Sequence, residues 1–165
     1  MELQATLAAC FARAFVRNDL FHKRQRDMQY TARITKEGKR TLVDFPDCPG
    51  CQTFAEPREN VLELAREALD GWLETHLEDG EAPPRPAAKR RRASDATYLP
   101  VRIDPTLAIR LEIRWARQDE NLSQGELAKR MGVSRQQISS LEAQGGNVTL
   151  ATLAKLAHAL GREVD

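Results

Sequence analysis

The chain has 165 residues, enough for one domain or two small ones, and its 41% hydrophobic content can build a core in each. No apolar run approaches the roughly 20 residues of a transmembrane helix, and the first segment lacks the early positive cluster of a secretory signal. Three cysteines without an export signal argue against a disulfide scaffold, so we expect a cytoplasmic protein.

The formal net charge of +1 is distributed unevenly along the chain. Residues 28–79 hold 6 basic and 11 acidic side chains, a net of −5, whereas residues 80–103 hold 6 and 2, a net of +4. Residues 104–165 hold 8 of each. Because nucleic acid repels an acidic surface, we expect residues 28–79 to meet a basic protein partner, although a solvated acidic helix face explains the same charge.

Residues 1–27 have apolar side chains at helical spacing, followed by the basic segment at residues 22–26. Two interpretations fit this segment. It forms an amphipathic helix that packs on the domain or on another copy, or it is the product of an upstream start codon. The recognisable domain pattern begins only at Met28.

Residues 28–79 have the pattern of three strands followed by a helix. Residues 30–35 and 41–45 alternate apolar and polar side chains, as half-buried strands do, and a turn at residues 46–50 precedes a short strand at residues 51–54. Pro57 suits the first turn of a helix that runs to about Leu77. The face predicted to cover the sheet contains Val61, Leu64, Ala65, Ala68 and Trp72.

Residues 80–97 are predicted to be a mobile basic loop, because proline-rich residues 80–86 cannot be helical and the run Lys89–Arg92 has no apolar periodicity. The basic run could touch DNA phosphates, but such runs in loops are usually solvated. Residues 98–103 follow as a short strand, which Pro100 restricts to a sheet edge. The fold class is therefore α+β: a three- to four-stranded sheet with one covering helix, then an all-α domain.

Cys48 and Cys51 are spaced as a CxxC pair within the turn. A redox pair needs its first thiol at a helix N-terminus, and this pair lies between predicted strands. One pair supplies two zinc ligands, and no second pair or histidine couple completes four. The chain also lacks a Ser-His-Asp set and a glycine-rich phosphate loop. We therefore predict no catalytic residues, no metal site, no cofactor and no enzyme activity.

The residues Phe45-Pro46-Asp47 and Pro49-Gly50-Cys51, with Cys48 between them and a tyrosine on the first strand, resemble the HicB antitoxin family. The resemblance covers about residues 28–103. It implies a partly degenerate RNase H-like domain that binds and masks a small, basic, mRNA-cleaving HicA-like toxin. The usual RNase H carboxylate set cannot be assembled here, so nuclease activity is not implied.

Residues 124–143 have the spacing of a helix-turn-helix. Ser123 and Glu126 can form a capping box, Ala128 lies where the two helices approach closely, Gly132 supplies the turn, and Ser134 can cap the second helix. The apolar seam between the helices contains Leu127, Met131, Val133, Ile138 and Leu141. An ordinary helical hairpin is the alternative, but the agreement of spacing, caps and polar face favours the helix-turn-helix.

Flanking segments complete a bundle of four or five short helices over residues 104–161. Asp104-Pro105 begins one helix, Thr149 caps the last one and Gly161 ends it. The pattern S-Q, small residue, G-V-S, I-S and L-E at residues 123–142 resembles the phage-repressor and Cro-like (XRE) family. A tail of this type is one that HicB-like domains carry, so the two resemblances support each other.

This second resemblance implies a recognition helix from about Ser134 to Ala143 in the major groove. Arg135, Gln136 and Ser140 would contact bases, with Gln137 as an addition, because their donors and acceptors suit guanine and adenine edges. Gln124 would hold a phosphate at a helix N-terminus. The complete predicted DNA-binding set is Gln124, Ser134, Arg135, Gln136, Gln137, Ser139, Ser140 and Asn147.

One short recognition helix on a neutral domain has little nonspecific attraction for DNA, so we expect at least a homodimer on an inverted-repeat operator. We predict that residues 28–103 bind the toxin and that residues 104–165 bind DNA. The predicted function is an antitoxin that represses its own operon. The alternative is a ligand-sensing repressor whose sheet domain binds a small molecule. A short basic reading frame beside the gene favours the first, and ligand-dependent release from DNA favours the second.

Overall fold

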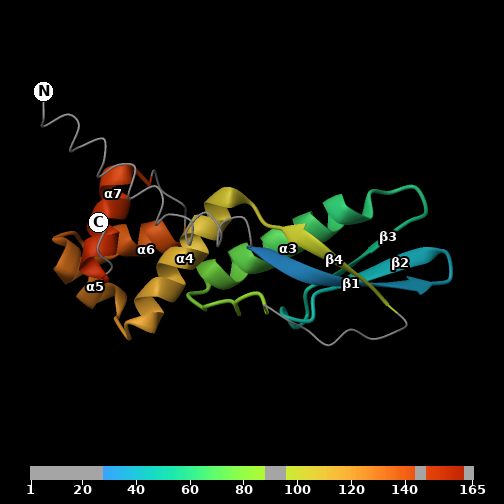
Figure 1. The fold of residues 1–165 in the computed structure, drawn as a ribbon, viewed down its shortest axis with the longest axis horizontal. Helices are drawn as coiled ribbons and strands as arrows, with labels where there is room; N and C mark the ends of the chain where they lie inside the picture. The colour runs from blue at the N-terminus through green and yellow to red at the C-terminus, as the bar shows by residue number, and fades with distance from the viewer. Residues whose placement is uncertain (1–27, 88–95, 144–147, 162–165) are drawn as a thin grey trace, which may run out of the picture.

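The computed structural model describes residues 28–87, 96–143 and 148–161, so the expectations for residues 1–27 lie outside the described residues. A four-stranded sheet with one long helix is followed by a bundle of shorter helices (Figure 1), which confirms the predicted α+β class. No helix in these three ranges is long and apolar enough to cross a membrane. The elements are β1 (Gln29–Glu37), β2 (Arg40–Asp44), β3 (Gln52–Ala55), α3 (Val61–Glu78), β4 (Thr97–Arg102), α4 (Pro105–Asp119), α5 (Gln124–Met131), α6 (Arg135–Ala143) and α7 (Leu150–Ala159).

The sheet has the order β3-β2-β1-β4 and all its pairs are antiparallel. The register places Ile34 opposite Val43 and Ala32 opposite Leu99, so the apolar positions of three strands meet on one face. β4 lies at an edge, as Pro100 predicts, because proline has no N–H for a second neighbour. The long helix α3 covers the apolar face.

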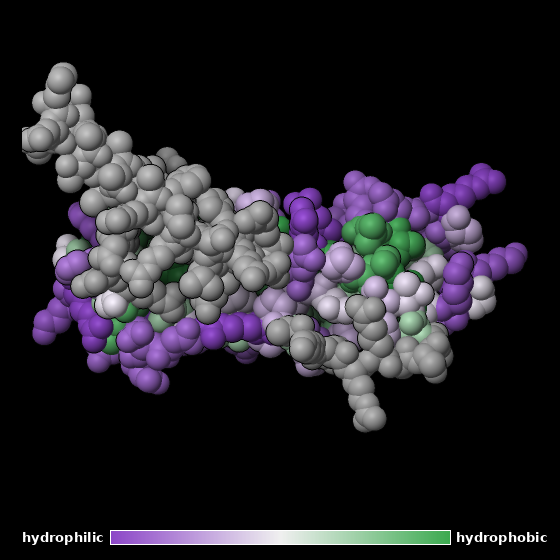
Figure 2. Space-filling model, in the orientation of Figure 1, coloured by the Kyte–Doolittle hydropathy of each residue, from purple (hydrophilic) through white to green (hydrophobic). Residues whose placement is uncertain are grey.

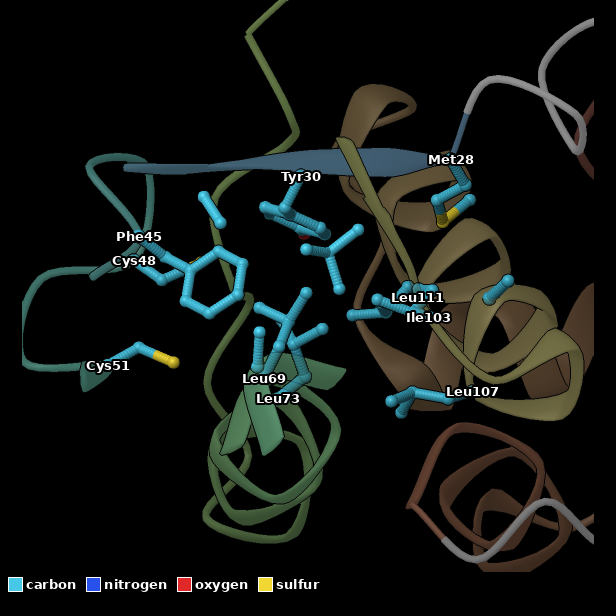
Figure 3. Packing of buried hydrophobic residues seen from close by; sticks show 14 of the residues in the cluster. Met28, Tyr30, Phe45, Cys48, Cys51, Leu69, Leu73, Ile103, Leu107 and Leu111 are labelled. Carbon is cyan, nitrogen blue, oxygen red and sulfur yellow. The ribbon is translucent and has the colours of Figure 1, made fainter. Parts of the chain in front are cut away.

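The space between the sheet and α3 is filled by large side chains. Tyr30 and Phe45 from the sheet side meet Leu69 and Leu73 of α3, and all four are fully buried (Figure 3). Each such side chain stabilises the fold by about 1.5–3 kcal/mol relative to an exposed position. This core holds the sheet and α3 together as one layer pair.

The structure corrects two predictions for α3. The helix begins at Val61 rather than at Pro57, because Asn60 caps it by accepting hydrogen bonds from the N–H groups of Leu62 and Glu63. The buried stripe is one position away from the predicted face, and of the predicted residues only Ala65 is fully buried. The stripe that covers the sheet is Ala65, Leu69, Leu73 and Leu77.

Both stripes have helical spacing, and packing against the sheet selects the stripe whose three leucines are fully buried. Val61 and Trp72 pack on the margin of the core, and Trp72 stacks on His76 with ring centroids 3.7 Å apart.

Helix α4 belongs to two cores. Leu107, Leu111 and Trp115 pack into the core of the sheet unit, whereas Ile113 and Ala116 on the other side pack into a second core. That second core also contains Leu122, Leu127, Ala128, Ile138, Leu156, Ala159 and Leu160. The predicted domain junction at residues 103 and 104 therefore precedes a helix that both cores use.

Residues 80–87, in the segment predicted to be a mobile loop, make hydrogen bonds to both parts of the fold. The Tyr30 hydroxyl donates to the Pro84 carbonyl and the Trp115 indole N–H donates to the Pro83 carbonyl, each at 2.8 Å. Arg85 pairs with Asp119 at 2.7 Å. These contacts anchor the first half of the segment, while the basic run Lys89–Arg92 lies outside the described residues.

Candidate nucleic-acid interface

The local geometry of a helix-turn-helix is present at α5 and α6. The Ser123 hydroxyl accepts from the Glu126 N–H at 3.2 Å, and the Glu126 carboxylate accepts from the Ser123 N–H at 2.7 Å, which confirms the capping box. The hydrogen bond that the carboxylate accepts from the Ser123 backbone, and after it the interaction with the Ser123 side chain, hold the pKa of Glu126 below its ordinary value. Gly132 then ends α5 with φ 66° in the left-handed region, as predicted for the turn.

The start of α6 is fixed by a second reciprocal pair. The Ser134 hydroxyl accepts from the Gln137 N–H at 3.2 Å, and the Gln137 side-chain oxygen accepts from the Ser134 N–H at 2.8 Å. Ser134 therefore caps α6 as expected, and Gln137 has a structural task in addition to its predicted DNA contact. Sequence reasoning missed this task, although serine followed three residues later by glutamine is its signature.

The exposed surface of α6 carries most of the predicted DNA contacts. Ser134, Arg135, Gln136 and Gln137 are exposed, whereas Ser139 and Ser140 are half-buried. Ile138 and Glu142 point inward and are fully buried. The polar side chains at the beginning of α6 are thus free of the core, as a recognition helix requires. Asn147, the remaining predicted contact on the C-terminal side, lies outside the described residues.

Predicted DNA-binding residues line two separate hollows on the surface. The first, which we name the junction hollow, measures about 690 Å³. Its lining is Leu77, Glu78, Gly80, Arg114, Arg117, Ser123, Gln124, Gly125, Arg135, Ser139 and Ala143. The second hollow measures about 570 Å³, and Ser134, Gln136, Gln137 and Ser140 line it with residues of α7 and of the turn. The structure thus brings Gln124, Arg135 and Ser139 together on one side of α6.

A buried ion pair connects α6 to α4. The Arg117 guanidinium contacts the Glu142 carboxylate twice, Nε to Oε1 at 2.6 Å and Nη2 to Oε2 at 2.9 Å. The Gln124 side-chain amide donates to Oε2 of the same carboxylate at 3.1 Å. An amide has two N–H bonds, so one of them ties α5 to α6 while the Gln124 side chain keeps a second donor.

Two further buried arginines connect this network to α3. Arg110 donates to the Glu142 and Ala143 carbonyls at the end of α6 and to the Glu74 carboxylate, the last at 3.4 Å. Arg114 donates to the Leu77 and Gly80 carbonyls at 3.0 and 2.6 Å. Burial lowers the pKa of Arg114, although the nearby Glu142 carboxylate acts in the opposite direction. One face of α4 therefore holds the ends of both α3 and α6.

Sequence reasoning missed this arginine network. Its signal was present, because residues 110, 114 and 117 share one face of a helix at i, i+4 and i+7. The network also changes the net charge that the surface of residues 104–165 presents. Three of the eight basic side chains in residues 104–165 are buried in it, against one acidic side chain, Glu142, so the accessible surface there is less basic than the count suggests.

The two cysteines of the sheet half lie in the segment between β2 and β3. Cys48 and Cys51 are buried in the turn, the Cys51 thiol contacts the Ala68 carbonyl at 3.6 Å, and burial raises the pKa of this thiol to about 11. Within residues 28–87, 96–143 and 148–161, no three His, Cys, Asp or Glu side chains are grouped to hold a metal. An apolar patch is visible on this half (Figure 2). Phe54 and Leu62 are the large hydrophobic side chains that are exposed among the described residues.

Comparisons with known proteins match the two parts of the chain separately. The family described as HicB_like antitoxin of bacterial toxin-antitoxin system matches residues 30–111, and a family described as Helix-turn-helix matches residues 113–165. The two matches meet inside α4, the helix that both cores share.

Two curated proteins of Photorhabdus laumondii subsp. laumondii are similar over most of their length. Antitoxin HicB 1 is 32% identical over 123 residues, which cover 74% of this chain and 75% of that protein. Antitoxin HicB 2 is 24% identical over 140 residues, which cover 85% of this chain and 96% of that protein. Among solved structures, a chain of a HicA3 and HicB3 toxin-antitoxin complex matches with a TM-score of 0.42 and 26% identity, over 47% of this chain and 100% of that chain.

Proposed function

The chain belongs to the HicB antitoxin family and carries a helix-turn-helix domain, and from this premise we propose that it masks a small, basic, mRNA-cleaving HicA-like toxin and represses the operon encoding both. One observation carries the proposal: α4 connects a HicB-like unit to a helix-turn-helix. The polar residues at the beginning of α6 in that helix-turn-helix are exposed. This role is regulatory and requires no catalysis by the antitoxin itself.

The toxin would bind the sheet unit, residues 28–103. Residues 28–79 of that unit carry a net charge of −5, and the outer side of α3 presents the exposed carboxylates of Glu63, Glu67, Glu74 and Glu78. A protein that cleaves mRNA needs a basic surface to hold RNA, so charge complementarity steers it to this unit. A masked active site also needs buried apolar contact, so we expect salt to weaken the complex only in part.

The operator would bind the helix-turn-helix, residues 104–165. Arg135, Gln136 and Ser140 would contact bases, with Ser134, Gln137 and Ser139 beside them, and Gln124 and Asn147 would hold phosphates. Because one α6 covers only a few base pairs, two copies would bind an inverted repeat about 34 Å apart on one side of the duplex. The small net attraction of the domain for DNA makes this second copy necessary.

The alternative of a small-molecule sensor gains no support from the sheet unit, because Tyr30, Phe45, Leu69 and Leu73 fill the space between the sheet and α3. The direct test combines two measurements on the full chain. It should copurify with a small, basic HicA-like toxin expressed in the same cells, and it should shift a DNA fragment from directly upstream of the gene. Neither protein complex nor DNA shift, from a chain shown to be folded, would contradict the proposal.

A further inference from the structure

The C-terminal end of α3 has a fixed position beside the recognition helix, and α3 and α6 are in contact. Arg114 donates to the carbonyl oxygens of Leu77 and Gly80, and Arg110 joins Glu74 on α3 to the last carbonyls of α6. Both guanidinium groups are buried, where an unpaired charge would cost several kcal/mol. These buried hydrogen bonds therefore fix the C-terminal end of α3 in place relative to α6.

Glu78 lies at this fixed end and lines the junction hollow. The same hollow is lined by Gln124 and Arg135, the residues predicted to meet a phosphate and a base at the edge of the operator site. The Glu78 side chain is exposed. It adds a full negative charge to the C-terminal end of a helix, where the helix dipole is already negative.

A DNA backbone that reaches Gln124 and Arg135 must pass along this hollow and hence close to Glu78. Exposed charges interact over a Debye length of about 10 Å at 0.1 M salt, so the carboxylate repels the nearest phosphates. Repulsion of this kind acts on the backbone and not on the bases, so it lowers affinity for every sequence alike.

Resting on the DNA-binding role proposed above, we propose that the DNA-facing surface extends from the helix-turn-helix onto the end of α3, where Glu78 weakens binding to all DNA. The HicB-like unit is then a direct neighbour of the operator backbone. The consequence is that the chain relies on base contacts and on a second copy for affinity, because nonspecific attraction is reduced at its own surface.

The chain offers a matched control on the same helix. Glu67 is exposed and lies on nearly the same face of α3, about three turns and 16 Å before Glu78. Glu67→Gln therefore makes the same change in net charge at a distance beyond the Debye length from Glu78. Glu78→Asp keeps the charge and serves as the conservative variant.

The experiment measures binding of the full chain and its variants to two labelled duplexes of equal length by fluorescence anisotropy. One duplex comes from directly upstream of the gene and the other has a scrambled sequence. At about 0.1 M salt, Glu78→Gln should tighten binding to both duplexes by the same factor, about 2- to 5-fold, and the gain should shrink at high salt. Glu67→Gln and Glu78→Asp should bind like the unsubstituted chain.

Three results would overturn the inference while leaving the proposed function intact. These are an unchanged affinity for Glu78→Gln, an equal gain for Glu67→Gln, and a gain confined to the upstream duplex. If the unsubstituted chain binds neither duplex, the DNA-binding role fails and the inference falls with it. Thermal melting of each variant shows that it is folded, and Glu78→Gln should melt no lower than the unsubstituted chain because it removes a charge that opposes the helix dipole.

Discussion

Arg117 on α4 and Glu142 on α6 form a two-contact ion pair whose side chains are 9% and 0% exposed, with Nε to Oε1 at 2.6 Å. This pair lies directly beneath the helix that we assign to DNA recognition. The same carboxylate accepts a hydrogen bond from Gln124 and lies 3.8 Å from Arg114. The Glu142 carboxylate is therefore shared by several donors of α4 and α5, and we expect the orientation of α6 to depend on it.

The first prediction concerns this carboxylate. Glu142→Gln should lower the free energy of unfolding by about 3–5 kcal/mol, because it leaves the buried guanidinium groups of Arg117 and Arg114 without a counter-charge. Urea denaturation followed by tryptophan fluorescence measures the change. Glu67→Gln, at an exposed position, should alter it by less than about 0.5 kcal/mol. A similarly small loss for Glu142→Gln would show that the pair does not hold α6.

The second prediction separates base contact from backbone contact. Gln136→Ala should weaken binding to the upstream operator by about 1–3 kcal/mol and leave binding to scrambled DNA unchanged, because Gln136 is exposed on α6, where we propose that it contacts a base edge. Gln124→Ala should weaken binding to both. Gln118→Ala is the matched control, since Gln118 is exposed near the end of α4 and does not belong to the predicted DNA-binding set. An equal loss on both duplexes for Gln136→Ala would remove its assigned role.

The third prediction concerns the turn of the helix-turn-helix. Gly132→Ala should destabilise the fold by about 1–2 kcal/mol, because φ 66° is strained for a residue with a Cβ. No atom lies within 4 Å of that Cβ position, so the cost is conformational and not steric. Gly71→Ala, in the middle of α3 with equally open space, should instead stabilise by about 0.5–1 kcal/mol. Thermal melts of the two variants should therefore shift in opposite directions, and a shift in the same direction would refute the argument.

Much of this local structure follows from short-range sequence signals. The capping box of Ser123 and Glu126, the left-handed Gly132 and the cap at Asp104 each depend on residues within a few positions of one another, and all are observed. The sheet edge follows in the same way from Pro100. Such features are decided by backbone geometry and hydrogen bonding within one turn, which a sequence displays directly.

Long-range packing was harder to predict. The two candidate stripes of α3 have the same spacing, and only the sheet decides that Leu69 and Leu73 are buried in place of Leu64 and Ala68. Arg110, Arg114 and Arg117 belong to a residue class that is rarely buried, and only their partners on α3 and α6 explain their position. The predicted DNA contacts at residues 124–140 stay predictions, since their role concerns a molecule outside the fold.

The fourth prediction concerns pH. Burial raises the pKa of the Cys51 thiol from 9.0 to about 11, so the folded state holds its proton more tightly than the unfolded chain. This contribution to stability is complete below pH 9 and is lost as the pH rises through 11. The stability advantage of the unsubstituted chain over Cys51→Ala should therefore shrink between pH 8 and 11 in urea titrations. Parallel curves would contradict the assignment of Cys51 as a buried, protonated thiol.

The fifth prediction concerns the division of the chain. Because Leu107, Leu111 and Trp115 of α4 complete the core of the sheet unit, a fragment of residues 28–119 should be more stable than one of residues 28–103. The difference should be several kcal/mol, at about 1.5–3 kcal/mol for each lost side chain. Thermal unfolding followed by circular dichroism measures it. Equal melting temperatures for the two fragments would place the domain junction before α4.

The central claim, that the sheet unit masks the toxin and the helix-turn-helix serves the operator, is tested most directly by growth rescue. A small, basic HicA-like toxin is expressed together with the full chain, with residues 28–119, or with residues 104–165. We predict that the first two restore growth and that the third does not. Rescue by residues 104–165 alone, or failure of a folded 28–119 fragment to restore growth, would contradict the account.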